Sequence, residues 1–309
     1  MNSTEQYLVD EELWHYSQGW ISRREFLRRA TVLGAGAAAA ATLGAITPAA
    51  VGAAPGAQVS PFHVPVGDPS VAADWVWYRS NGGVELKAYL AWPTDAAMTA
   101  SLPGVAVCQE NQGTNAYILD VTRRFAKAGY MAIAPDLVSR FGIPTDEFTE
   151  PTELTGAMRR LSDEQTPLDV SAALDYLRSH PAVDESKLAA IGFCMGGDVI
   201  WRLATMYPDL KAAAPFYGSN PSLDQVPNIR AAMLGVYGDL DTRTNVGIEA
   251  LKDALQAAGI THRITIYPNS QHAFHADHRT QYNAETATQA WTDTLNWFAT
   301  YLGLQPPTM

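Results

Sequence analysis

The sequence predicts an α/β domain with a mostly parallel central sheet, flanked by helices and preceded by an N-terminal hairpin. Short apolar runs alternate with segments of helical spacing, as expected for strands joined by crossover helices. Polar segments follow several of these runs, which places candidate functional loops at one edge of the sheet. After a leader, about 250 of the 309 residues remain, and this length fits one domain.

The predicted strands are short apolar or alternating runs bounded by turn residues. They cover residues 74–79, 84–91, 104–109, 131–134, 188–191, 212–217, 231–237 and 262–267. The first two flank Ser80-Asn81-Gly82-Gly83, whose Asn-Gly and Gly-Gly pairs favour a tight hairpin turn. The predicted helices have apolar side chains at helical spacing. They cover residues 117–128, 168–177, 197–207, 248–258 and 285–302.

Residues 137–165 interrupt the alternation of strands and helices. The segment contains Pro144, Pro151 and scattered acidic residues. We therefore expect an irregular lid or cap there, with one short helix near residues 153–160.

Residues 1–57 have the features of an export leader, and the domain is expected to cover residues 58–309. Arg23 and Arg24 precede a weakly apolar Ala/Gly-rich segment, residues 30–46, which is the pattern of a twin-arginine (Tat) signal. We expect export by the Tat machinery to the periplasm or beyond, with cleavage near residues 51–53. An uncleaved membrane tether is the alternative, but the segment is short against the ~20 strongly apolar residues that span a bilayer.

Charge and composition narrow the range of partners. The formal charge is −11, of which −10 belongs to the part after the leader, and this argues against binding to nucleic acid or anionic membranes. There is no Rossmann glycine signature and no phosphate-binding loop, so no nucleotide cofactor is expected. We expect a monomer. The two cysteines, Cys108 and Cys194, are expected to stay free, with Cys108 a buried strand thiol.

Residues 192–196, Gly-Phe-Cys-Met-Gly, lie between a predicted strand and a predicted helix. This strand–turn–helix has the G-x-C-x-G spacing of a nucleophile elbow, with cysteine in the position that serine usually takes. A thiol at a helix N-terminus is shifted towards the reactive thiolate by the helix dipole. Cys194 is therefore a candidate nucleophile. The alternative is a buried structural cysteine in a Gly-rich turn.

A cysteine nucleophile needs a base, and the base needs an orienting carboxylate. His272 follows the last predicted strand, where an α/β-hydrolase places its histidine. His275 and His278 are close in sequence, but no cysteine or acid pair at metal-ligand spacing accompanies them, so we expect no metal. Asp239 and Asp241 both follow the strand at 231–237, and spacing does not choose between them.

Glu110 is a third carboxylate of interest, because it follows the predicted strand at residues 104–109. A carboxylate at this edge could accept the Cys194 proton or hold an arginine. The alternative is an ordinary loop carboxylate.

Several motifs in fixed order resemble the dienelactone hydrolase family, a branch of the α/β-hydrolase fold with a cysteine nucleophile. They are Gln109-Glu110-Asn111, Ala134-Pro135-Asp136-Leu137, residues 192–197, Pro215-Phe216-Tyr217-Gly218 and His272-Ala273-Phe274. The resemblance extends to exported members with a twin-arginine leader, whose acid lies in a Leu-Asp-Thr-Arg stretch, and it implies Asp241 as the acid. It also implies that Glu110 interacts with the resting thiol and helps to form the thiolate once substrate binds.

One feature departs from the family pattern. Well-studied members hold a substrate carboxylate with an arginine shortly after the His-x-Phe motif, and this chain has none at the matching place. The arginines that could replace it are Arg140, Arg159, Arg160, Arg243 and Arg279.

The expected function is hydrolysis of ester or lactone bonds in a small molecule. Cys194, activated by His272 and Asp241 with help from Glu110, would attack the carbonyl to form an acyl-enzyme. The backbone N–H groups of Met195 and Asn111 would stabilise the oxyanion. Two alternatives remain: a carboxylesterase without activity on dienelactones, and a non-catalytic exported binding protein on the same fold.

Overall fold

The structure is a computed structural model that describes residue 27, residues 59–95 and residues 101–305. Apart from Leu27, the predicted leader with its twin arginines and cleavage region lies outside the described residues. In the part of the chain that is described, no helix has the combined length and apolarity needed to cross a membrane.

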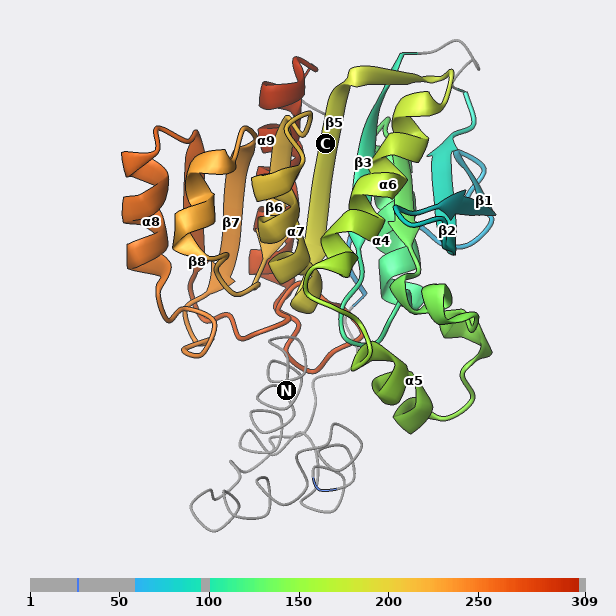
Figure 1. Cartoon of the computed structure of the whole chain (residues 1–309), viewed down its shortest axis with the longest axis horizontal. Coiled ribbons are helices and arrows are strands. Elements are labelled where there is room, and N and C mark those ends of the chain that lie inside the picture. The colour runs from blue at the N-terminus through green and yellow to red at the C-terminus, as the bar shows by residue number, and fades with distance from the viewer. Residues whose placement is uncertain (1–26, 28–58, 96–100, 306–309) are drawn as a thin grey trace.

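Eight strands form one sheet in the order β1-β2-β4-β3-β5-β6-β7-β8 (Figure 1). Their bounds are β1 Val71–Arg79, β2 Glu85–Pro93, β3 Leu102–Cys108, β4 Met131–Pro135, β5 Val183–Phe193, β6 Ala212–Phe216, β7 Ala232–Gly238 and β8 His262–Tyr267. The β1–β2 hairpin is antiparallel, β2 joins β4 in antiparallel register, and every remaining pair is parallel. The predicted mostly parallel sheet with an N-terminal hairpin is confirmed.

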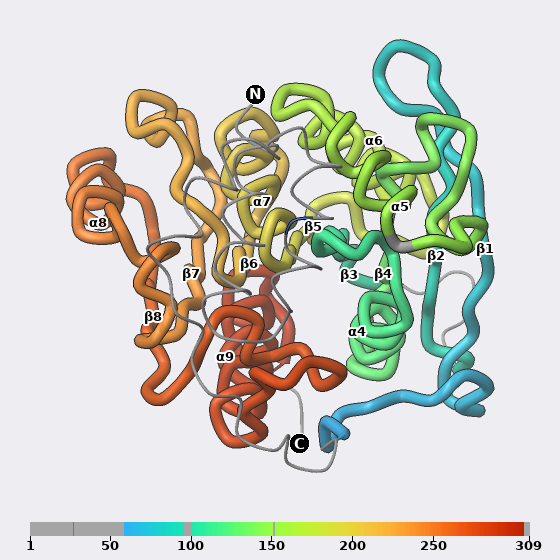
Figure 2. The backbone as a smooth tube through the Cα atoms, turned by 90° about the horizontal axis from the view of Figure 1, so that it is seen from below, coloured from blue at the N-terminus to red at the C-terminus, as the bar shows by residue number. Residues whose placement is uncertain are grey.

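Helices cover both faces of the sheet, with α6 and α7 on one side and α4 and α9 on the other (Figure 2). The helices are α4 Ala116–Lys127, α5 Pro151–Met158, α6 Gln165–Ser179, α7 Met195–Met206, α8 Ile248–Ala257 and α9 Ala284–Leu302. Because both faces are covered, β4, β6 and β7 are buried along their whole length. This explains why they appear in the sequence as continuous apolar runs.

The segment between β4 and α6 differs in detail from its prediction. Short 3₁₀ helices occupy Leu137–Phe141 and Thr145–Glu147. The α-helix begins at Pro151, two residues before the predicted start, because the fixed φ of proline suits the first helical position. The parallel topology brings the ends of β3, β5, β6, β7 and β8 to one edge of the sheet, where the predicted site residues lie.

Candidate active site

Cys194 lies in a strained turn between β5 and α7. Its φ of 59° and ψ of −123° fall in a region that side chains other than glycine rarely adopt. The Cys194 N–H donates to Phe216 O at 3.1 Å, and the Cys194 carbonyl accepts from Gly197 N at 2.8 Å. These bonds at the ends of β5, β6 and α7 hold the cysteine in the geometry of an elbow, with its side chain almost fully buried.

The glycines on either side of Cys194 are required by close backbone contacts. A Cβ on Gly192 would lie 2.1 Å from Gly196 O, and a Cβ on Gly196 would lie 2.3 Å from Gln109 O. The second contact joins the elbow to the loop after β3, which carries Glu110 and Asn111. Any side chain at position 196 would therefore push the two parts of the site apart.

Asp241 and His272 form a fully buried pair at the ends of β7 and β8. His272 Nδ1 lies 2.6 Å from Asp241 Oδ2. Burial works to raise the Asp241 pKa, but the charge and hydrogen bond of His272, together with Thr244, hold that pKa below its usual value. An ionised carboxylate can only accept, so His272 Nδ1 donates to it, and Nε2 is the ring nitrogen that this hydrogen bond leaves for exchange of a proton with another group.

The structure separates the two candidate acids. Asp239 Oδ1 accepts from the backbone N–H of Ser270 at 3.0 Å and so serves the loop after β8. Asp241 lies in a turn closed by its own N–H, which donates to Gly238 O at 3.1 Å, and its side chain faces inwards. Asp241 is thus the acid that reaches His272.

Glu110 is buried in a cage of polar side chains. Its carboxylate accepts from Arg279 Nη2 at 2.8 Å and from Asn115 Nδ2 at 2.7 Å, and it lies 3.3 Å from His278 Nε2. Burial works to raise the Glu110 pKa, but the Arg279 and His278 charges outweigh it and lower the pKa to about 2. Glu110 is therefore a permanent anion at neutral pH, and it is not an ordinary loop carboxylate.

Of the five candidate arginines, Arg279 is the one that the structure ties to Glu110. Its Nη2 also donates to Asn111 Oδ1 at 3.0 Å. Arg140 pairs instead with Asp169, and Arg160 packs over the ring of Phe141. Arg279 therefore places a guanidinium next to the residue that was predicted to contribute an oxyanion N–H.

The Glu110 cage gives a prediction for stability against pH. A carboxylate whose pKa falls from 4.5 to about 2 on folding stabilises the fold above pH 4.5 and loses that contribution as the pH falls towards 2. Between pH 4.5 and pH 2, the free energy of unfolding of wild type should therefore fall by about 3 kcal/mol more than that of Glu110→Gln. Urea unfolding of both proteins across this range measures the difference, and parallel curves would contradict the prediction.

The neighbouring histidines do not form a metal site with His272. His275 is buried, and its Nδ1 shares a 2.7 Å hydrogen bond with the Tyr117 hydroxyl. Burial lowers the His275 pKa well below its usual value, and Arg124 adds to this shift. His278 is directed to Glu110. Two of the three histidines are thus committed to other partners.

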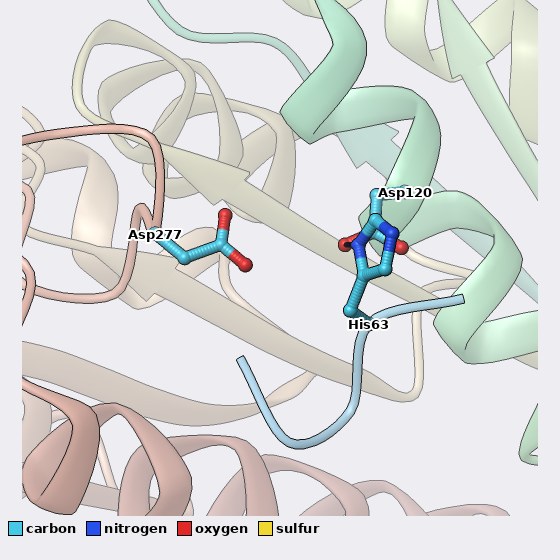
Figure 3. Close-up of side chains that lie close together, drawn as sticks. All are labelled: His63, Asp120 and Asp277. Atoms are coloured by element: carbon cyan, nitrogen blue, oxygen red, sulfur yellow. Dashed lines mark ion pairs between the residues drawn. The ribbon is translucent and has the colours of Figure 1, made fainter. Parts of the chain in front are cut away.

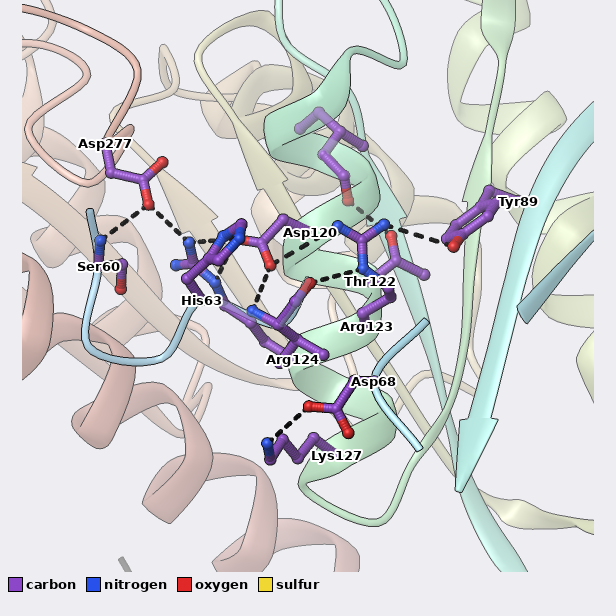
Figure 4. A network of polar contacts seen from close by, with 12 residues as sticks. Ser60, His63, Asp68, Tyr89, Asp120, Thr122, Arg123, Arg124, Lys127 and Asp277 are labelled. Atoms are coloured by element: carbon purple, nitrogen blue, oxygen red, sulfur yellow. Dashed lines mark hydrogen bonds and ion pairs between the residues drawn. The ribbon is translucent and has the colours of Figure 1, made fainter. Parts of the chain in front are cut away.

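A second polar cluster lies beside α4. His63, Asp120 and Asp277 bring ligand-type atoms within 4.8 Å of one another (Figure 3). The Arg124 guanidinium lies among them, because its Nη2 donates to Asp120 Oδ2 and, at 2.9 Å, to Asp277 Oδ2 (Figure 4). Asp277 also accepts from Ser60 N at 3.0 Å. The buried Arg124 guanidinium already occupies these carboxylate oxygens and would repel a cation, so the cluster is not suited to bind a metal. We call this set of contacts the Arg124 clamp.

This Arg124 clamp ties the N-terminal segment and the catalytic-edge loop 272–279 to α4. Asp277→Asn is expected to lower the free energy of unfolding by about 1–3 kcal/mol, because it leaves the buried guanidinium with one anionic partner fewer. Asp95→Asn, at an exposed position, is the control and should change stability by less than about 0.5 kcal/mol. Equal urea midpoints for the two variants would show that the clamp adds nothing.

Met195 and Asn111 belong to two different segments, the start of α7 and the loop after β3. Met195 is the first residue of α7, and the first N–H groups of a helix have no acceptor within the helix. Asn111 follows Glu110 in the loop after β3, with its side chain held by Arg279. Because Gly196 of α7 lies against Gln109 of the β3 loop, backbone N–H groups of these two segments are candidates to stabilise an oxyanion at Cys194.

Comparison with known proteins shows extended similarity. The sequence model of the dienelactone hydrolase family matches residues 86–302. A Salmonella typhimurium relative, provisionally named a carboxymethylenebutenolidase, is 35% identical, covering 82% of this chain and 96% of its own. A relative of the same provisional name from Escherichia coli K12 is also 35% identical, over 76% of this chain and 90% of its own.

The fold comparison agrees. The crystal structure of a provisionally named dienelactone hydrolase from Klebsiella pneumoniae superposes with a TM-score of 0.67 and 34% identity, covering 75% of this chain and 99% of that one. The α/β-hydrolase fold is thereby confirmed. The chain belongs to the dienelactone hydrolase family, a family of hydrolases that act on ester and lactone bonds.

Proposed function

We propose that this protein hydrolyses an ester or lactone through a Cys194–His272–Asp241 triad and an acyl-enzyme. The observation that supports this most is the buried 2.6 Å pair of His272 and Asp241 at the same sheet edge as the strained elbow cysteine. Three residues of the types that acyl transfer needs thus follow three strands that end at one edge of the sheet, and this supports the proposal.

In the proposed reaction, His272 Nε2 takes the proton from Cys194 Sγ, and the sulfur adds to the carbonyl carbon. The N–H groups of Met195 and Asn111 stabilise the oxyanion, and each such donor contributes about 3–4 kcal/mol in comparable sites. His272 then gives its proton to the departing oxygen. Water, deprotonated by His272, releases the acid and restores the thiol. Asp241 holds the imidazole tautomer throughout.

Arg279 is the arginine that we propose to meet a carboxylate on the substrate. It already holds an anion, Glu110, at 2.8 Å, so its position suits a carboxylate. A substrate carboxylate that competes for the guanidinium would loosen Glu110, whose free oxygens could then assist proton removal from Cys194.

A substrate panel tests this function. We expect hydrolysis of an unsaturated carboxylate-bearing lactone and of a p-nitrophenyl ester with a free carboxylate, and slower hydrolysis of the matched neutral ester. Preference for the neutral ester would favour a carboxylesterase. A protein that turns over none of these and whose Cys194 does not react with iodoacetamide would favour the binding-protein alternative.

We also propose that the protein is exported by the Tat machinery. The supporting feature is the Arg23-Arg24 pair ahead of the weakly apolar segment 30–46. Replacing both arginines with lysine should retain the protein in the cytoplasm. Export of the double variant at the wild-type rate would contradict the proposal, and intact-mass measurement of the exported protein would locate any cleavage.

A further inference from the structure

Tyr217 occupies a position beside the elbow that the reaction described so far does not use. Phe193 of β5 pairs with Phe216 of β6. Cys194 and Tyr217 are the next residues of these two parallel strands, so their backbones are neighbours. Tyr217, like Cys194, has a positive φ, of 39°. A bulky residue in this region costs about 1–3 kcal/mol and persists where the surrounding structure holds it, which is common at active sites.

The surroundings of Tyr217 hold both its backbone and its ring. Its N–H donates to Val236 O at 2.7 Å. The ring is buried and packs against the His272 imidazole with 5.0 Å between centroids, and against Phe274 at 5.8 Å. The positive-φ backbone therefore places this residue in the strand end next to Cys194 with its ring against His272.

The Tyr217 hydroxyl is buried and makes no hydrogen bond of acceptable geometry. Other buried tyrosines of the sheet do: Tyr78 donates to Asp169 O at 2.9 Å, and Tyr237 accepts from Trp201 Nε1 at 3.0 Å. The neighbouring Tyr117 hydroxyl is bonded to His275. It also lies close enough to the Tyr217 hydroxyl to work against the rise in the Tyr217 pKa, but the two hydroxyls do not have the geometry of a hydrogen bond. A buried hydroxyl without a hydrogen-bond partner lowers the stability of the fold by about 1–3 kcal/mol. The Tyr217 hydroxyl is therefore a donor that remains available to an acceptor formed during the reaction.

The electrostatic surroundings keep that donor protonated. Burial raises the Tyr217 pKa well above its usual value, and the nearby Glu110 and Cys194 raise it further. The phenol therefore stays neutral at any working pH and can donate to an anion. The charged or titratable groups that face this position come from the loop after β3, from α4 and from the loop after β8, and they are Glu110, Tyr117, His272 and Arg279.

We propose that the Tyr217 hydroxyl donates a hydrogen bond to the Cys194 thiolate, which makes Tyr217 a further residue of the reaction centre. The inference rests on the proposed function. When His272 takes the proton from Cys194 Sγ, the negative charge remains on sulfur and accepts from the Tyr217 O–H, which keeps its own proton. When sulfur bonds to the acyl carbon its charge is lost, and the hydroxyl is released until the thiol leaves the acyl group.

Tyr217→Phe isolates the hydroxyl, because phenylalanine keeps the ring against His272. The test is the rate of iodoacetamide alkylation of Cys194 as a function of pH. Without the donor, the midpoint of this curve should rise by about one unit, which is about 1.4 kcal/mol. The kcat of ester hydrolysis below the midpoint should fall about tenfold, with KM little changed. Tyr78→Phe, which loses a buried hydroxyl on β1, is the matched control and should leave the midpoint unchanged.

An unchanged midpoint in folded Tyr217→Phe would overturn the inference. The urea midpoint of the variant is measured alongside and is expected to be at least that of wild type, because Tyr217→Phe no longer buries a hydroxyl without a hydrogen-bond partner. Cys194→Ala separates the two claims. Full ester hydrolysis by Cys194→Ala would overturn the proposed function itself, whereas an inactive Cys194→Ala with an unshifted Tyr217→Phe would overturn only the role of Tyr217.

Discussion

Cys194→Ala is expected to lower kcat for ester hydrolysis by about 10⁴-fold or more. The substitution removes the only atom that the proposed mechanism joins to the substrate, while the oxyanion donors and the His272–Asp241 pair stay in place. The residue is almost fully buried in the turn before α7, and alanine fits the space of a thiol. Steady-state kinetics with a p-nitrophenyl ester measures the loss.

Cys108→Ala is the matched control for this prediction. Cys108 is also a free, buried thiol, and its strand pairs with that of the elbow at Gly192. Burial raises the Cys108 pKa well above its usual value, so it is an inert thiol. Cys108→Ala should therefore keep turnover within a few-fold of wild type. Comparable losses in both variants would point to a packing effect and away from a nucleophile.

Asp241→Asn is expected to lower kcat by about 10³-fold to 10⁴-fold at neutral pH. The amide can donate to His272 Nδ1, which would favour the tautomer with its proton on Nε2 and so remove the base. The imidazolium that forms during the reaction would also lose its buried counter-charge. The ordinary packing of the site should survive, because asparagine has the same shape.

Asp239→Asn distinguishes this account from the other acid that spacing allows. Asp239 bonds to a backbone N–H after β8 and does not reach His272. Its substitution should cost stability of about 1 kcal/mol, with kcat within a few-fold of wild type. If instead Asp239→Asn were inactive and Asp241→Asn active, the assignment of the acid would be wrong.

The elbow could be predicted from sequence because its constraints are local. Gly192 and Gly196 flank the cysteine at fixed spacing, and the structure shows the backbone contacts that exclude a side chain there. The positions of Asp241 and His272 after predicted strands were also readable, since parallel strands end at one edge of the sheet. Sequence spacing could not choose between Asp239 and Asp241 as the acid, because the conformation of the turn after β7 decides which carboxylate faces His272.

The partners of Glu110 could not be predicted from neighbouring residues in the sequence. Arg279 lies 169 positions away in sequence, and the arginine expected from the family pattern is missing from its usual place. Only the folded structure shows that Arg279, further along the loop after β8, reaches Glu110. Tyr217 was visible within a quoted motif, yet its position next to Cys194 depends on the β5–β6 register, which the sequence does not state.

Identification of the acylated residue tests the central claim most directly. A p-nitrophenyl ester is mixed with the protein, the reaction is quenched in acid during turnover, and the peptides are analysed by mass spectrometry. We predict the acyl group on the peptide that contains Cys194 and none on the peptide that contains Cys108. Active turnover with no acyl group on Cys194, or with the acyl group on another residue, would contradict the account.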